Sequence, residues 1–242
     1  MVIQSFAKIN LSLSVNKRLK NGLHDIQSIY CLVDLKDKIS IKKAKNKNID
    51  QISFQGPLSK DIKLSDNSII KLLYILRKIK LVSNYYSINI VKNIPTFSGF
   101  GGGTSNAAAV LNFLIKKRIS KRILNKIIRY VGSDLRLFFH KQGYLKNINT
   151  VLKFKKRYKL NFLLVYPRIK SSTKDVFSNI KKYSKKKISL HNHFKSKNEF
   201  IDHVRELNND LQSVVVKKHP QINKLLKNIS KIKGCFFSRM TG

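Results

Sequence analysis

The sequence predicts an α+β protein, because stretches with the two-residue period of a strand alternate with stretches that have helical spacing. A strand is predicted from Tyr86 to Ile90, and a helix where apolar side chains recur from Ile69 to Ile79. Between that strand and an alanine-rich helix lies a glycine cluster, with four glycines in positions 99–103. This unit of strand, glycine turn and helix is the central feature of the sequence, and the other elements are interpreted in relation to it.

The glycine turn predicts a site for an anion, most simply a phosphate. Missing side chains let main-chain N–H groups approach a ligand closely, and the start of a helix adds partial positive charge. A Walker A loop is excluded because no lysine occurs between Asn93 and Leu114. A dinucleotide fingerprint is excluded because no acidic residue follows the turn before Asp134.

The N-terminal third reads as strands. Apolar residues alternate with polar ones over 9–15, which predicts a half-buried strand with Lys8 and Asn10 on its polar face. A second alternating strand over 29–35 follows the turn residues Asn21-Gly22, so the two are expected to form a hairpin. Residues 39–53 are expected to form further strand with a basic loop.

Helices dominate the middle of the chain. Asp66-Asn67 is a cap signal for the helix over 69–79, which we interpret as core. The helix after the glycine turn is expected over 106–117, and a further one over 120–130. Three side chains are placed to cap the helix after the turn: Thr104, Ser105 or Asn106.

The C-terminal part is richer in lysine and has no glycine clusters. Residues 160–166 predict a buried strand that ends at Pro167. Pro220 fits the first position of a further expected helix, through Leu226.

The formal net charge of +38 ordinarily suggests nucleic acid or an anionic surface as a partner. The lysines are spread along the whole chain beside abundant Asn and Ile, which favours a codon bias and solvated loops instead. Cys31 and Cys235 have no partner motif and are expected to be reduced thiols. Without a membrane-spanning run or a leader, the protein is expected to be cytoplasmic.

The segment Pro-x-x-x-Gly-x-Gly-Gly-Gly-Thr-Ser-Asn-Ala-Ala, which starts at Pro95, resembles the phosphate loop of the GHMP kinases. Within that superfamily the chain is most similar to the 4-diphosphocytidyl-2-C-methyl-D-erythritol kinases. The resemblance implies a GHMP kinase-like two-domain fold: an ATP-binding, ribosomal protein S5 domain 2-like α/β unit over 1–150, and a ferredoxin-like α+β domain on the substrate side over 151–242. It implies that the following residues bind the nucleotide: Pro95, Thr96, Phe97, Ser98, Gly99, Phe100, Gly101, Gly102, Gly103, Thr104, Ser105 and Asn106.

Two further segments resemble motifs of the same family. A lysine at the head of a half-buried strand is usually an edge residue that extends its charge to solvent. Ala7-Lys8-Ile9-Asn10-Leu11, however, matches the family's Ala-Lys-x-Asn-Leu motif, and this match favours an active-site lysine at Lys8. Gly132-Ser133-Asp134 matches the segment with the catalytic base, although an aspartate there also suits a helix cap. Arg136 stands where relatives carry proline, and either pairs with Asp134 or points to solvent.

On the substrate side, relatives have a Gly-Tyr-His turn whose two rings grip cytosine. Here it reads Gly22-Leu23-His24, so the imidazole is kept and a π-face is lost. The resemblance also places Thr173 and Phe177 against the cytidine, although a phenylalanine is as often core. With Asn10 and His24, they are the expected substrate-orienting residues. Asn208-Asn209-Asp210-Leu211 also matches a family segment that precedes a helix, so the resemblance implies a helix there.

The implied activity is ATP-dependent phosphorylation of the 2-hydroxyl of 4-diphosphocytidyl-2-C-methyl-D-erythritol, in non-mevalonate isoprenoid synthesis. Lys8 and Asp134 are the expected catalytic residues, ATP and Mg²⁺ the cofactors, and Ser105 the metal ligand. We expect a monomer or weak homodimer that binds neither nucleic acid nor membrane. Leu23 leaves open another GHMP kinase acting on a mevalonate-type or sugar substrate. The many lysines leave open a basic nucleic-acid-binding module, and the short C-terminus an inactive remnant.

The chain ends within a third motif. Ser238-Arg239-Met240-Thr241-Gly242 resembles the start of the family's Ser-Arg-Met-Ser-Gly-Ser-Gly segment. Relatives continue with a strand and a closing helix, so about 40 residues are expected to be missing by that comparison.

Overall fold

The computed structural model describes residues 1–45, 48–60, 62, 67–154, 156–169, 172–184 and 194–241. The chain divides into two compact units, each assembled from several segments. Unit 1 consists of Met1–Lys8, Leu32–Thr96 and Phe100–Phe139, and unit 2 of Ile9–Cys31, Phe97–Gly99 and His140–Gly242. Two strands contribute residues to both units: β1 (Val2–Asn10) and β3 (His24–Lys43).

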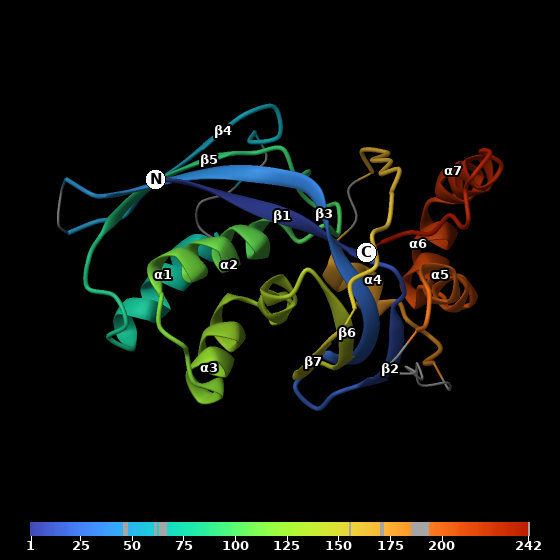
Figure 1. The fold of residues 1–242 in the computed structure, drawn as a ribbon, viewed down its shortest axis with the longest axis horizontal. Coiled ribbons are helices and arrows are strands. Elements are labelled where there is room, and N and C mark those ends of the chain that lie inside the picture. Colours follow the sequence, from blue (N-terminus) through green and yellow to red (C-terminus); the bar gives the residue numbers. More distant parts are fainter. Residues whose placement is uncertain are drawn as a thin grey trace. The chain divides into compact units, whose positions relative to one another are not determined.

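Unit 1 packs three helices against strands. β5 (Tyr86–Val91) pairs in parallel with β4 (Gln51–Gln55) and antiparallel with residues 38–43 of β3. Every second side chain of β5 is buried, as the predicted alternation requires. Three helices lie on one side of these strands: α1 (Ser68–Lys78), α2 (Gly102–Leu114) and α3 (Lys121–Val131) (Figure 1).

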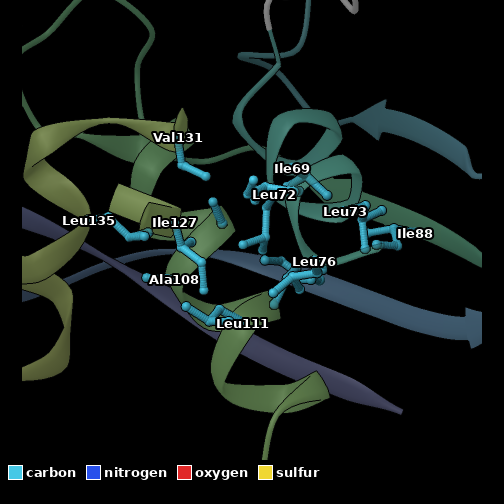
Figure 2. Packing of buried hydrophobic residues seen from close by; sticks show 14 of the residues in the cluster. Ile69, Leu72, Leu73, Leu76, Ile88, Ala108, Leu111, Ile127, Val131 and Leu135 are labelled. Carbon is cyan, nitrogen blue, oxygen red and sulfur yellow. The ribbon is translucent and has the colours of Figure 1, made fainter. Parts of the chain in front are cut away.

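The core of unit 1 lies between these helices and the sheet (Figure 2). The apolar stripe of α1 provides Leu72, Leu73 and Leu76, which are fully buried, and Ile88 meets them from β5. Figure 2 also shows Ala108, Leu111, Ile127, Val131 and Leu135 closing the cluster from α2, α3 and the segment that follows. Burial of such side chains contributes about 1.5–3 kcal/mol each, which makes this cluster the main stabilising element of the unit.

The predicted cap of α1 is confirmed at Asn67, whose side chain accepts a hydrogen bond from Ile69 N–H. Helix α3 also has a side-chain cap, since Ser120 accepts a hydrogen bond from Ile123 N–H. Asp66, the other half of the first cap signal, lies outside the described residues.

The predicted start of α2 at Asn106 is wrong, as are the three predicted caps. The helix begins at Gly102, and its N-cap is Gly101 in the left-handed conformation, with φ +69° and no side-chain hydrogen bond. Ser105 and Asn106 are buried inside the helix instead. Glycine occupies the N-cap position in place of the expected polar residue, because the left-handed conformation brings the Cβ of any other residue too close to the main chain.

The strands of unit 2 are built around the first half of β3. The predicted hairpin is confirmed: β2 (Ser14–Arg18) pairs antiparallel with β3, and Gly22 in the turn has φ +80°. β3 also pairs with β6 (Gln142–Asn147), which pairs with β7 (Thr150–Lys153).

The strand predicted over 9–15 is interrupted. β1 ends at Asn10 and β2 begins at Ser14, because the N–H groups of Leu11 and Ser12 both donate to the Ile29 carbonyl. Two residues thus oppose one, in the manner of a bulge, which the period of the side chains alone does not reveal.

The helices of unit 2 are α4 (Thr173–Ser178), α5 (Lys197–Glu206), α6 (Asp210–Lys218) and α7 (Pro220–Ser230). The helix implied beside Asn208–Leu211 is α6, which begins within that segment at Asp210 and is capped by Asn209. The helix start predicted at Pro220 is confirmed, since Pro220 is the first residue of α7. A smaller apolar core joins α4, α6 and α7 to the strands, through Leu13, Val15, Val176, Leu211, Val215 and Ile222.

The strand predicted over 160–166 is wrong. This segment has no regular structure, and Phe162, Leu163 and Val165 are 39%, 67% and 41% exposed. Among the described residues the order of the sheet ends at β7, so the segment has no strand partner. An apolar stretch becomes a strand only where a ladder of main-chain hydrogen bonds is available.

The predicted α+β class is confirmed by this mixture of sheet and helices. Within the described part of the chain, no helix has both the length and the apolar character that crossing a membrane requires.

Candidate active site

Lys8 and Asp134 form an ion pair within unit 1. Lys8 Nζ lies 3.5 Å from Asp134 Oδ2. Lys8 comes from β1, and Asp134 from the short 3₁₀ helix η2 (Ser133–Phe139), which follows α3. The lysine side chain is only 7% exposed, whereas the carboxylate is 38% exposed and accessible to a ligand. The two predicted catalytic residues are therefore brought together.

Arg136 lies two residues after Asp134 on the same short helix. Its guanidinium is half-buried, and this burial lowers the pKa of Arg136. The side chain is therefore partly withdrawn from solvent.

The glycine turn packs directly on the stem of Lys8. Lys8 N–H donates to the Phe100 carbonyl at 3.0 Å. A Cβ on Gly101 would lie 3.4 Å from Lys8 Cγ and only 2.9 Å from Cζ of Phe138. A side chain at position 101 would collide with Phe138, and the positive φ also disfavours any residue except glycine. The glycine turn can therefore pack this closely on Lys8 only because residue 101 is glycine.

The start of α2 offers main-chain donors beside this pair. The first N–H groups of a helix have no acceptor within the helix, and Gly101 supplies no side-chain cap. Gly102 and Gly103 leave these groups without side-chain cover. Together with the partial positive charge of the helix start, they suit a phosphate group.

Ser105 and Asn106 point inward and join α2 to β1. Ser105 Oγ donates to the Phe6 carbonyl at 2.6 Å and lies 2.7 Å from Ser5 Oγ, while Ser5 Oγ also lies 2.7 Å from Asn106 Oδ1. Ser5 was missed by the sequence reasoning, since a serine within a strand carries no motif. This polar cluster is buried and fixes the position of the helix.

The contacts of Ser105 do not fit the predicted magnesium site. Its hydroxyl is 2% exposed and already bonded to Phe6 and Ser5, so it is unsuited to a metal ligand in this arrangement. The described residues contain no group of three or more His, Cys, Asp or Glu side chains suited to a metal.

The other predicted loop residues are divided between the units. Pro95, Thr96, Phe100 and Thr104 belong to unit 1, and Phe97–Gly99 to unit 2. Phe97 has φ +53° and is 60% exposed, and Gly99 has φ +74°. The main chain therefore turns tightly twice before the helix begins.

Unit 2 brings His24 and Phe177 together. Their rings stack with centroids 5.1 Å apart and an interplanar angle of 30°. Burial, and to a lesser extent the positive charge of Arg18, lowers the pKa of His24 below its ordinary value of 6.5. The imidazole is therefore neutral at neutral pH, with one donor and one acceptor.

Tyr183 is a third ring in this group, and the sequence reasoning missed it. Its centroid lies 6.3 Å from that of His24, and its side chain is 41% exposed. The next residue, Ser184, fixes the position: its N–H donates to the Val15 carbonyl at 2.8 Å, and its hydroxyl to Asp210 at 2.6 Å. No motif marks a tyrosine in a lysine-rich segment, so only the fold reveals this neighbour.

Asn10 has protein partners for its whole amide. Its Nδ2 donates to the Thr241 carbonyl at 2.7 Å, and its Oδ1 accepts from Ser28 at 3.0 Å. Its role toward a substrate stays a prediction, as does that of Thr173, which begins α4 and whose side chain lies outside the described part of the chain.

The third motif is bound to unit 2 through Arg239. The guanidinium donates to the carbonyls of Leu11, Val204 and Arg205. Burial lowers the pKa of Arg239 to about 10, which leaves it charged at neutral pH. Arg239 is thus held by three main-chain carbonyls, while Asn209 and Gln212 hold Met240 through their side-chain amides.

Comparison with known proteins shows the family to which the chain is related. Residues 67–136, which contain α1, the glycine turn and Asp134, match the family model for the GHMP kinases N terminal domain. In fold, the chain resembles a crystal structure of 4-(cytidine 5'-diphospho)-2C-methyl-D-erythritol kinase, with a TM-score of 0.63, 18% identity, and coverage of 95% of this chain and 82% of that one. It also resembles a homoserine kinase from Cytophaga hutchinsonii, with a TM-score of 0.65, 13% identity, and coverage of 100% and 82%.

Two curated relatives are similar in sequence over nearly their whole length. The 4-diphosphocytidyl-2-C-methyl-D-erythritol kinase of Pelagibacter ubique (strain HTCC1062) is 36% identical over 99% of this chain and 85% of its own. The enzyme of the same name from Ureaplasma parvum serovar 3 is 34% identical over 92% of this chain and 85% of its own. At this identity and coverage, the chain belongs to the 4-diphosphocytidyl-2-C-methyl-D-erythritol kinase family, one of the GHMP kinases.

Proposed function

We propose that the chain transfers the γ-phosphoryl group of ATP to the 2-hydroxyl of 4-diphosphocytidyl-2-C-methyl-D-erythritol, in the non-mevalonate route to isoprenoid precursors. The names of its relatives support the substrate and the phosphoryl transfer. The observation that carries the proposal is the Lys8–Asp134 ion pair beside Gly101 and the start of α2.

In this mechanism, the N–H groups at the start of α2 hold the phosphates of ATP. Asp134 accepts the proton of the attacking hydroxyl, whose oxygen bonds to the γ-phosphorus as the bond to the bridging oxygen of ADP breaks. Lys8, whose Nζ lies 3.5 Å from Asp134 Oδ2, stabilises the negative charge between the acceptor and the γ-phosphate. Magnesium, when bound with the nucleotide, neutralises phosphate charge in such reactions.

On the side of the acceptor, the rings of His24, Phe177 and Tyr183 suit the cytosine base. A base stacks on aromatic faces, and a neutral imidazole offers a donor and an acceptor to its edge. Tyr183 would thereby supply the aromatic face that Leu23 lacks in the turn.

A coupled assay of ADP release, with ATP and a panel of acceptors, tests the proposal. We expect turnover with 4-diphosphocytidyl-2-C-methyl-D-erythritol and none above background with mevalonate, homoserine or galactose. Turnover of one of those three alone would replace the proposed acceptor while keeping the kinase. Absence of ADP release with all of them would contradict the proposed activity.

A further inference from the structure

An ion pair enclosed in unit 1 lies behind the glycine turn and takes no part in the mechanism above. Asp37 on β3 is fully buried, and Lys92, which follows β5, is 3% exposed. The ammonium of Lys92 donates to Asp37 Oδ2. Removing two charges from water is costly, and an apolar pair of similar volume is often no less stable. Stability alone therefore gives little reason for charges at these two positions.

The other oxygen of the carboxylate holds the main chain that leads into the loop. Asp37 Oδ1 accepts hydrogen bonds from the N–H groups of Asn93 and Ile94, at 2.7 and 2.8 Å. Asn93 Nδ2 also donates to the carbonyl of Lys36, at 3.0 Å. These bonds fix the residues immediately before Pro95, where the strand ends and the loop begins.

The groups held by Asp37 lie directly behind the first residue of α2. A Cβ added to Gly102 would lie 3.0 Å from Cγ2 of Ile94 and 3.2 Å from Nζ of Lys92. Ile94 is fully buried, so it has no room to move away. Ile94 and the Lys92 ammonium, both held by Asp37, therefore fill the space behind Gly102, at the helix start that offers its N–H groups to a phosphate.

We propose that Asp37 is a positioning residue for the phosphate-binding turn. Its Oδ1 sets the course of the main chain at Asn93 and Ile94, and its Oδ2 holds the Lys92 ammonium behind Gly102. This inference rests on the proposed function, since it assigns the turn to ATP. Displacing donors by a fraction of an ångström weakens every bond to the phosphates, while the Lys8–Asp134 pair keeps its own contacts.

Two double variants separate positioning from stability. Asp37→Asn with Lys92→Met removes both charges and keeps an oxygen that accepts from the two N–H groups. Asp37→Leu with Lys92→Met also removes both charges and leaves those N–H groups without an acceptor. The matched control is Asp50→Asn: Asp50 pairs with Arg77 and accepts from Tyr86 N–H at 2.9 Å, at the opposite end of β5.

The measurements are the Kd for ADP by calorimetry, KM for ATP, kcat and the Tm. We expect the leucine double variant to raise Kd and KM about tenfold or more, with kcat at saturating ATP within about threefold of the wild type. The asparagine double variant should stay within about threefold in Kd. Asp50→Asn should lower the Tm and leave the Kd unchanged.

Equal Kd values for the two double variants would overturn the inference, as would an increase in Kd for Asp50→Asn as large as that for the leucine variant. If the leucine variant does not fold, Asp37→Ala with Lys92→Met, which removes the same acceptor with a smaller side chain, must show the increase in KM for ATP. If the wild-type protein does not bind ADP, the proposed nucleotide site at the glycine turn is itself wrong. Unchanged variants of an ADP-binding wild type would overturn the positioning role alone.

Discussion

The Lys8 ammonium lies 3.5 Å from the Asp134 carboxylate, with the lysine enclosed and the carboxylate open. A lysine at the head of a strand usually extends its charge to solvent, whereas this one is buried beneath the glycine turn. A buried ammonium requires a partner, and Asp134 provides it. The partner in turn keeps an accessible face, which is what a base that must reach a substrate hydroxyl requires.

Asp134→Asn should lower kcat at least about 100-fold, equivalent to about 2.7 kcal/mol of transition-state stabilisation, because an amide cannot accept the hydroxyl proton. The Kd for ADP should change little, since the main-chain donors of α2 remain. Steady-state kinetics with calorimetry measure both quantities.

Asp202→Asn is the matched control for this substitution, because Asp202 pairs with Arg205 at the same 3.5 Å on the surface of α5. It should leave kcat unchanged. A loss of ADP binding in Asp134→Asn, with kcat at saturating ATP preserved, would show that the carboxylate serves the nucleotide instead.

Gly101→Ala should raise KM for ATP about tenfold or more and lower the Tm, since a methyl group there meets Phe138 at 2.9 Å and the backbone has φ +69°. Gly234→Ala provides the comparison, because Gly234 has φ +85° but open space around it. It should lower the Tm without affecting KM. If both substitutions lower the Tm equally and neither changes KM, the approach of the turn to Lys8 has no role in nucleotide binding.

Much of this fold follows from local signals. Helix α1 and strand β5 have strong periodicity. Cap and turn residues, such as Asn67 before α1 and Gly22 between β2 and β3, act through contacts with near neighbours. The three motifs identified the family, because they preserve residue types that phosphate binding and proton transfer require. The domain boundary at residue 150 stays a prediction.

The failures come from contacts that are distant in sequence. Ser105 looked like a cap or a metal ligand, but Ser5 and the Phe6 carbonyl bind its hydroxyl inside unit 1. Residues 160–166 had the composition of a buried strand and lack a described partner strand. Tyr183 carries no motif, and the hydrogen bonds of Ser184 to Val15 and Asp210 place it beside His24. Local patterns contain no information about such partners.

The lowered pKa of His24 predicts that KM for the cytidylyl substrate depends on pH only in the acidic range. Burial and Arg18 lower its pKa, so the neutral form that suits a base edge persists below pH 6.5. We expect KM for the cytidylyl substrate to be flat from pH 8 to about 6.5 and to rise only below that value. His24→Gln, which cannot titrate there, should give a flat profile.

An NMR titration of the ring measures the pKa of His24 directly, and Arg18→Gln should raise it. The same shift predicts that the contribution of His24 to the free energy of unfolding is complete above pH 6.5 and declines as the pH falls through that value, since the unfolded state binds the proton first. An increase in KM that begins above pH 6.5 would contradict the role given to the neutral imidazole.

Tyr183 tests whether one aromatic residue has replaced another in the substrate site. Leu23 is 48% exposed and offers no π-face, whereas Tyr183 lies beside His24 with 41% of its side chain exposed. Tyr183→Leu should therefore raise KM for the cytidylyl substrate about fivefold, equivalent to about 1 kcal/mol of stacking, with kcat and KM for ATP unchanged. Tyr74→Leu removes a comparably exposed ring from α1 and should have no effect.

The decisive variant combines Tyr183→Leu with Leu23→Tyr. If the ring is needed for stacking and its origin in the chain is not, the double variant should recover most of the lost affinity. Recovery would show that Tyr183 supplies the stacking face that the turn lacks because position 23 is a leucine. A double variant as weak as Tyr183→Leu alone would mean that Tyr183 acts by supporting His24, and the turn would then have lost its aromatic contact without replacement.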